Sequence, residues 1–172
     1  MMTNKDLEQL ITEYGKDIYS FCLHLTGNRD TADDLYQETF LTVVKRQRTL
    51  DKVEQPKAYL LSVAAHLWTN MKRKYARRMG IAPVTSYDDA LLVETKDNAD
   101  EQLLADEKKK QVQQAVASLP EKLRMVVLLH YMEELPVKEI AKVLRIPEGT
   151  VKSRLKHARD TLAVALEDNE NE

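Results

Sequence analysis

Residues 136–162, with the sequence PVKEIAKVLRIPEGTVKSRLKHARDTL, decide the fold of this chain. Apolar side chains recur at helical spacing in two runs, which the short segment 145–147 separates. The apolar positions are Val137, Ile140, Ala141 and Leu144 in the first run, and Val151, Leu155, Ala158 and Leu162 in the second. The small side chain of Ala141 permits a close crossing of two helices. The pattern predicts a helix-turn-helix, whose second helix enters the major groove of DNA.

The second helix of this motif carries polar side chains on the side opposite its apolar residues. With Val151 and Leu155 facing inward, a repeat of 3.6 residues per turn directs these polar groups outward or to the boundary of the core. The candidate DNA contacts are Thr150, Lys152, Ser153, Arg154, Lys156 and His157. Their donors suit base edges and phosphates. The same spacing also fits an amphipathic helix pair with a solvated polar face, so the motif alone leaves both interpretations open.

The rest of the chain is predicted to be helical as well, because apolar residues recur at spacings of three and four. Helices are expected over 6–25, from a cap at Asp30 or Thr31 to about residue 46, over 57–78 and over 103–119, with further helices starting at Pro120, Pro136 and Pro147. Residues 47–55 and 80–100 lack this periodicity and predict a loop and a linker. The last helix is expected to end near Leu166, before a frayed tail.

The predicted fold class is all-α, with two small helical domains. The first covers residues 1–79 with three or four helices, and the second covers 101–172 and contains the helix-turn-helix. Net charge follows the same division: residues 1–79 carry +3, residues 80–118 carry −4 and residues 119–166 carry +3. A polyanion therefore meets two basic blocks, although the whole chain of 172 residues has a net charge of −2.

Several classes of protein are disfavoured by composition. The single cysteine, Cys22, lies in an apolar run, which excludes a disulfide within the chain and favours a core position. His24, His66, His130 and His157 have no metal-like spacing, and no phosphate-binding glycine loop appears. We expect no cofactor, no small-molecule substrate and no enzymatic activity. The absence of a long apolar run and of a signal peptide favours a soluble, cytoplasmic protein.

A basic cluster closes the helix predicted over 57–78. Residues 72–78 read KRKYARR and place five positive charges and one tyrosine at its end. Positive charge near a helix C-terminus complements the helix dipole without any ligand. The same cluster also suits the DNA backbone, with His66 and Asn70 available to hydrogen-bond bases held in pockets. Both interpretations remain open from these residues alone.

Taken together, these segments resemble the extracytoplasmic-function class of sigma factors, the smallest members of the main bacterial sigma family. The resemblance spans nearly the whole chain: ADDLYQETFL at 32–41 resembles the second conserved region, and residues 59–74 resemble the helix that engages the −10 element. Residues 118–132 and 139–159 resemble the helix before the −35-reading unit and that unit itself. Two unrelated motifs in this order, separated by a linker, make the resemblance specific.

The resemblance implies three groups of contact residues. The resemblance assigns docking on the coiled coil of the polymerase β′ subunit to Asp33, Asp34, Leu35, Gln37, Glu38 and Phe40. Leu35 and Phe40 also fit a core position. Contacts to −10 DNA fall to Lys52, Val53, Gln55, His66, Asn70, Arg73, Lys74 and Arg77. The six polar residues of the helix-turn-helix named above fall on the −35 contacts. The resemblance also implies contact with the β flap, binding of promoter DNA and an anti-sigma partner.

Some positions depart from the family pattern. Tyr59, Ser62 and His66 stand where the family usually has Trp, Arg and Asn, and His157 stands where Arg is frequent. The promoter sequence therefore cannot be transferred from the family. Two alternatives remain: a free-standing helix-turn-helix regulator that binds its operator as a dimer, and a helical adaptor such as an anti-sigma protein. The first leaves residues 32–41 unexplained, and the two basic blocks argue against the second.

Overall fold

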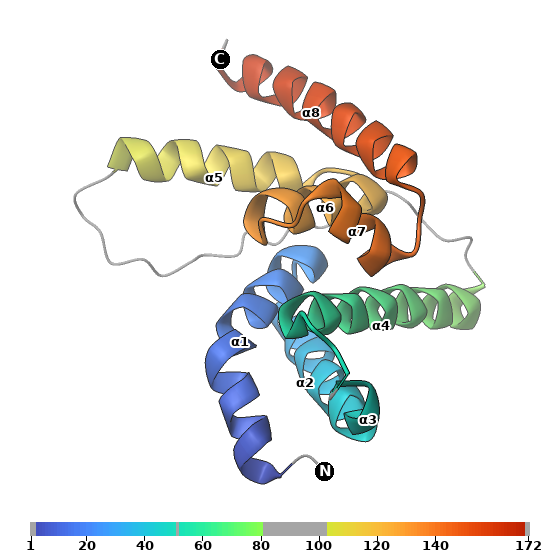
Figure 1. The fold of residues 1–172 in the computed structure, drawn as a ribbon. Helices are drawn as coiled ribbons and strands as arrows, with labels where there is room; N and C mark the ends of the chain where they lie inside the picture. The colour runs from blue at the N-terminus through green and yellow to red at the C-terminus, as the bar shows by residue number, and fades with distance from the viewer. Residues whose placement is uncertain (1–2, 51, 81–102, 171–172) are drawn as a thin grey trace.

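The computed structural model describes residues 3–50, 52–80 and 103–170, and these residues contain helices and turns but no strand. Its N-terminal group consists of α1 (Asn4–Thr26), α2 (Arg29–Lys45), the short α3 (Gln47–Leu50) and α4 (Pro56–Met79). Figure 1 shows α1, α2 and α4 packed on one another in the lower half of the molecule. The expected loop over 47–55 was wrong in part, since its first four residues are helical.

The junction between α1 and α2 is set by a glycine and an asparagine. Gly27 adopts the left-handed conformation with φ of 68°, which residues with a Cβ rarely adopt, and its N–H donates to the carbonyl of Leu23. The Asn28 side chain then accepts a 3.1 Å hydrogen bond from the Thr31 N–H. The predicted cap at Asp30 or Thr31 was wrong: α2 begins at Arg29, because the left-handed glycine lets Asn28 take the extended cap conformation.

The C-terminal group holds the helix-turn-helix. It comprises α5 (Leu103–Ala117), α6 (Glu121–Val127), the π-helical turn η1 (Leu128–Met132), α7 (Val137–Leu144) and α8 (Glu148–Glu170). The turn between α7 and α8 includes Arg145 with φ of 56°, and the Ile146 N–H donates to the Ala141 carbonyl. The predicted turn is confirmed. The expected end of the last helix near Leu166 was wrong, since α8 continues to Glu170.

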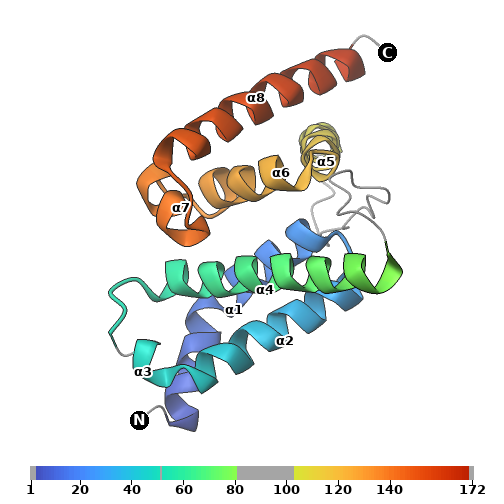
Figure 2. The same ribbon diagram turned by 90° about the vertical axis from the view of Figure 1, so that its right-hand side faces the viewer.

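One hydrophobic cluster joins the two groups. It contains Leu60 and Ala64 from α4 together with Leu129 of η1 and Ile140 of α7, all of them 0% exposed. Figure 2 shows α6 and α7 lying over α4 and α1. Burying one such aliphatic side chain contributes about 1.5–3 kcal/mol. The predicted division into domains 1–79 and 101–172 stays a prediction, and all of the predicted linker 80–100 except Gly80 lies outside the described residues.

Candidate nucleic-acid and protein interfaces

The outer side of α8 presents a row of polar side chains. Val151, Leu155 and Ala158 are 0–2% exposed and anchor the helix on the core. On the opposite side, Lys152, Ser153, Lys156 and His157 are exposed, whereas Thr150 and Arg154 are half-buried at its edge. The six residues thus form one continuous side of a helix, which we call the α8 face. Its ammonium, hydroxyl and imidazole groups are free to meet hydrogen-bond acceptors.

Two contacts fix the α8 face relative to the rest of the C-terminal group. The Thr150 and Val151 N–H groups donate to the Pro147 carbonyl, which begins the helix directly after the turn. Farther along, the Arg159 guanidinium donates to the Tyr131 hydroxyl of η1 at 3.4 Å. Arg159 therefore hydrogen-bonds within the C-terminal group, and the α8 face consists of the residues before it.

The exposed side of α2 carries most of the residues expected at a polymerase contact. Asp33, Asp34, Gln37 and Glu38 are exposed, and Asp33 accepts a 2.8 Å hydrogen bond from the Tyr19 hydroxyl. This bond, and then burial, raises the pKa of Tyr19 above its ordinary value. We call the exposed side made by Asp34, Gln37 and Glu38 the α2 face.

The apolar residues of α2 divide between the core and the surface. Leu35 is 0% exposed and Phe40 is 6% exposed, so both pack in the core, which the sequence had allowed as an alternative to a polymerase contact. Phe40 makes an edge contact with the ring of Tyr36. Conversely, Leu41 is 51% exposed. The spacing in the sequence is consistent with this exposure of Leu41. Position 41 follows Gln37 by four residues and Glu38 by three, so it lies on the same side of the helix as both.

The exposed part of α4 brings the basic residues of the −10 prediction together. Asn70, Arg73, Lys74 and Arg77 are all exposed near the C-terminal end of the helix, and Lys52 and Gln55 are exposed in the segment before it. Val53 and His66 are only half-buried. A groove of about 340 Å³ lies between residues 53–62 and α7, where Glu139, Lys142 and Val143 form its other wall.

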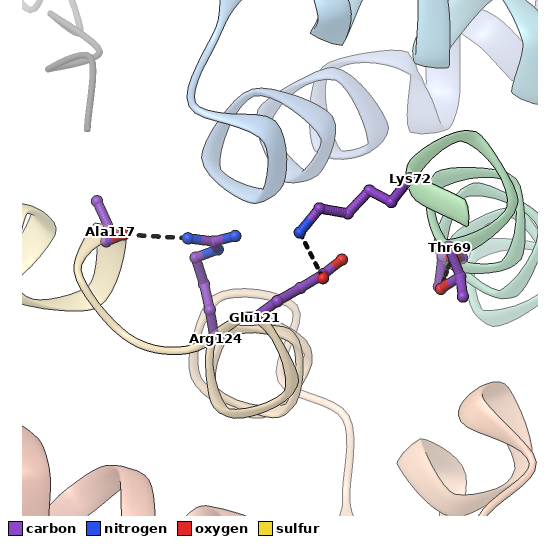
Figure 3. A network of polar contacts seen from close by, with 6 residues as sticks. Thr69, Lys72, Ala117, Glu121 and Arg124 are labelled. Carbon is purple, nitrogen blue, oxygen red and sulfur yellow. Dashed lines mark hydrogen bonds and ion pairs between the residues drawn. The ribbon is translucent and has the colours of Figure 1, made fainter. Parts of the chain in front are cut away.

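Lys72 differs from the other basic residues of this cluster. It reaches from α4 to Glu121 of α6, with 2.5 Å between Nζ and the carboxylate oxygen (Figure 3). Its ammonium also lies 5.4 Å from the ring centre of Trp68. Figure 3 further shows the guanidinium of Arg124, which is fully buried and donates to the Ala117 carbonyl across the α5–α6 turn. Four of the five charges of the cluster thus remain at the surface.

Two family models match this chain in chain order. "Sigma-70 region 2" matches residues 10–78, and "Sigma-70, region 4" matches residues 109–162. The first range contains the α2 face and the basic part of α4, and the second contains the whole helix-turn-helix. Along most of its length the chain also aligns with the ECF sigma factors SigW and SigM of Bacillus subtilis. The chain belongs to the extracytoplasmic-function sigma factors. It is an alternative sigma factor, which directs RNA polymerase to promoters for transcription initiation. The match to region 4 accounts for the helix-turn-helix. The match to region 2 disfavours a regulator that acts without polymerase, because such a regulator needs no sigma region 2.

Individual relatives align along nearly the whole sigma factor. The chain is 29% identical over 164 residues to "ECF RNA polymerase sigma factor SigW" of Bacillus subtilis, covering 92% of this chain and 88% of that protein. It is 28% identical over 167 residues to the "ECF RNA polymerase sigma-E factor" of Escherichia coli, covering 92% and 85%. Its fold is similar to the sigma factor RpoE in complex with the anti-sigma factor NepR from Bartonella quintana, with a TM-score of 0.73, 20% identity and coverage of 95% and 98%.

An ion pair with one buried partner connects the two helical groups of this sigma factor. The Lys57 ammonium of α4 lies 3.0 Å from the Glu133 carboxylate, which follows η1 and has a side chain only 3% exposed. Asp17 of α1 lies 3.5 Å from the same ammonium. Burial raises the pKa of Glu133 above its ordinary value despite the attraction of Lys57. Burial acts against charge on Lys57 too, but the two carboxylates prevail and raise its pKa.

His66 lies beneath α7 rather than on an open surface. Burial lowers the pKa of its imidazole below the ordinary value of 6.5, and the neighbouring Arg145 lowers it further. Beside it, the Ser62 hydroxyl donates to the Val143 carbonyl at 3.2 Å. His66 is therefore half-buried, whereas Asn70 and Arg73, farther along the same helix, are exposed.

Other groups of the sigma factor are structural. Cys22 is fully buried, as predicted, and burial raises the pKa of its thiol from 9.0 to about 12. Within the described ranges, no cluster of three or more His, Cys, Asp or Glu side chains is arranged to hold a metal ion. None of the helices described combines the length and apolar character that a bilayer crossing requires.

Proposed function

We propose that the three surfaces described above carry out the three contacts of initiation. The α2 face, with Asp33 beside it, docks on the β′ subunit. Residues Lys52, Val53, Gln55, His66, Asn70, Arg73, Lys74 and Arg77 engage −10 DNA, and the α8 face reads the −35 duplex. The observation that carries this proposal is the α8 face itself: its exposed donors stand opposite three anchoring apolar residues, which is the geometry of a recognition helix.

The mechanism assigns a physical task to each surface. Exposed Lys156 and His157 suit acceptors on base edges in the major groove, and exposed Arg73 and Arg77 suit phosphates. A base taken out of the −10 strand loses the free energy of stacking. Contacts from the α4 region offset this cost. Without polymerase, the chain binds promoter DNA weakly, since its net charge is −2. Polymerase holds both modules on one promoter and so raises the effective concentration of the second contact.

The proposal includes several further properties. The chain carries out no chemical step of its own, acts in the cytoplasm and uses no cofactor or small-molecule substrate. The 101–172 domain also contacts the β flap, and the 1–79 domain carries the β′ and −10 contacts. An anti-sigma partner regulates it; this is supported by the likeness of fold to RpoE, whose structure contains the anti-sigma factor NepR.

A double variant of the α8 face tests the proposal. Lys156→Ala with His157→Ala removes two exposed donors whose side chains support no core contact. Each lost base contact costs about 1–3 kcal/mol, so we expect promoter-specific RNA to fall by about tenfold or more. The measurement is run-off transcription with purified core polymerase, together with the affinity of the chain for that polymerase, which should stay unchanged.

Lys110→Ala provides the matched control, since Lys110 is an exposed lysine of α5 outside the proposed surfaces. Unchanged promoter choice in the double variant would remove both residues from the −35 contact. Operator binding by the chain alone, with no initiation by added polymerase, would overturn the whole proposal in favour of a free-standing regulator.

A further inference from the structure

The side of α4 that carries Tyr59, Ser62 and His66 is covered by α7 of the same chain. The Ser62 hydroxyl donates to the backbone carbonyl of Val143, and the imidazole of His66 lies near Arg145. Tyr59 and His66 belong to the segment expected to engage −10 DNA, whereas Val143 and Arg145 belong to the helix-turn-helix. The two DNA-reading units are therefore packed against each other, and one of them covers part of the other.

The polar groups at this contact are poorly satisfied. The Tyr59 hydroxyl and the Nε2 atom of His66 are buried, and within the part of the chain that the structure describes neither makes a hydrogen bond of good geometry; the His66 ring interacts with the backbone of Val143. Natural interiors leave few such groups, since each one costs free energy that water or a partner would otherwise recover. The groove beside them, about 340 Å³, also leaves the contact between residues 53–62 and α7 incompletely filled. This side of α4 thus has hydrogen-bonding capacity that α7 does not use.

Apolar packing and two ion pairs nevertheless hold the contact together. Leu60 and Ala64 of α4 share one cluster with Leu129 and Ile140. Lys57 pairs with the buried Glu133 near the start of α4, and Lys72 pairs with Glu121 fifteen residues farther along the same helix. The ion pairs therefore bracket the covered side of α4. A buried carboxylate such as Glu133 is tolerated only while its partner is present, which makes the Lys57 pair decisive for closure.

We propose that this packing is a self-inhibited, closed form of the sigma factor. In it, α7 masks the His66 side of α4, and the Lys57–Glu133 pair is the latch that must separate before −10 DNA is engaged. The proposal rests on the proposed function for the role of His66, but closure is a property of the chain alone. The α8 face stays exposed in the closed form, so closure blocks the −10 contact and leaves the −35 contact uncovered.

Three variants of the full chain test the latch. Lys57→Glu places a carboxylate opposite Glu133 and Asp17, and Glu133→Lys places an ammonium opposite Lys57, so both open the closed form. The double variant Lys57→Glu with Glu133→Lys restores attraction with the charges exchanged. Lys16→Glu is the matched control, because it makes the same charge change at an exposed position of α1. Circular dichroism verifies that each variant keeps its helices.

The first measurement is small-angle X-ray scattering of the chain without polymerase. Wild type and the control should give a radius of gyration near that of a compact 172-residue chain, about 16 Å. The single variants should be larger and the double variant should return toward wild type. An extended wild-type chain would overturn closure, and single variants that stay as compact as wild type would overturn the latch.

The second measurement is the affinity of each chain for core polymerase. In the proposed function, polymerase holds the α2 face and the 101–172 domain apart, so only the open chain makes both contacts. A chain that is closed most of the time then binds with its intrinsic affinity reduced by the open fraction, and the single variants should bind about tenfold or more tightly. Unchanged affinity in helical, expanded single variants would overturn the inhibitory role. Since scattering involves no promoter, failure of the opened single variants to initiate transcription would refute the proposed function and leave closure standing.

Discussion

Among single residues, His66 reports most directly on the closed form. Burial, and then Arg145, lowers its pKa below 6.5, so the closed form binds fewer protons at this site than an open chain does. Closure therefore loses stability as the pH falls below about 6.5. Glu133 acts with the opposite sign nearer its ordinary pKa of 4.5, because its raised pKa favours the protonated closed form.

We expect the imidazole of His66 to titrate at a lower pH in wild type than in Lys57→Glu, where the closed form is opened. Two-dimensional NMR of the ring protons measures both titrations directly. The Lys16→Glu control should follow wild type. Identical titration of His66 in the open variant and in wild type would show that α7 does not determine its environment.

The burial or exposure of a residue was predictable where it depends on the repeat of a single helix. Val151 and Leu155 fix the orientation of α8, and Lys152, Ser153 and Lys156 are exposed as the helical repeat requires. Leu35 and Phe40 fit both a polymerase contact and the core, and packing against α1 and α4 placed them in the core. The covering of His66 depends on a contact with residues about 80 positions away, which no local spacing encodes.

Among the elements, α2 depends on its N-cap. The Asn28 side chain satisfies the Thr31 N–H, which otherwise has no acceptor in the first turn of the helix. We expect Asn28→Ala to reduce the free energy of unfolding by about 1 kcal/mol, as loss of an N-cap usually does. Urea denaturation followed by circular dichroism measures the change.

Asn28→Ser is the control for this prediction, because serine also accepts a hydrogen bond at an N-cap. It should unfold close to the wild-type midpoint. Equal loss in both variants would indicate that packing of the half-buried Asn28 side chain, and not the cap, determines the cost.

The differences between expected and observed elements share one cause. Helix interiors were predictable from apolar spacing, whereas ends depend on backbone conformations and on neighbours. Gly27 in the left-handed conformation moved the cap of α2 to Asn28, and α3 forms from four residues without any apolar repeat. The helical conformation of α8 extends past its last apolar residue, Leu166, to Glu170.

For the whole molecule, the exposed basic end of α4 predicts a salt dependence of promoter binding. The triple variant Arg73→Ala, Lys74→Ala and Arg77→Ala removes three exposed charges. Each lost phosphate contact lowers the slope of log K against log salt by roughly 0.7–0.9, so a total decrease of about 2–3 is expected. The measurement is holoenzyme binding to promoter DNA across a salt series.

A second triple variant, in which Lys108, Lys109 and Lys110 of α5 become alanine, controls for the loss of net charge. Its slope should remain that of wild type. If both triple variants lower the slope equally, general charge rather than the α4 surface governs the salt dependence.

The all-helical architecture and the order of its parts were predictable from sequence, because each amphipathic helix shows its own apolar side. The joining of both groups around a common cluster was not, since Leu60 and Ile140 lie 80 positions apart and their pattern is equally compatible with separate cores. Tertiary packing between sequence-distant helices decided that outcome.

The common cluster has a consequence for genetics. Leu60 and Ile140 are not among the proposed nucleotide or polymerase contacts, yet they help to determine how tightly the two groups associate. A mutational screen for raised promoter output should therefore recover substitutions in this apolar interior as well as at the reading surfaces. We expect natural selection on basal transcription to act on the same interior positions. The basal expression of the target genes then depends partly on residues that do not contact DNA.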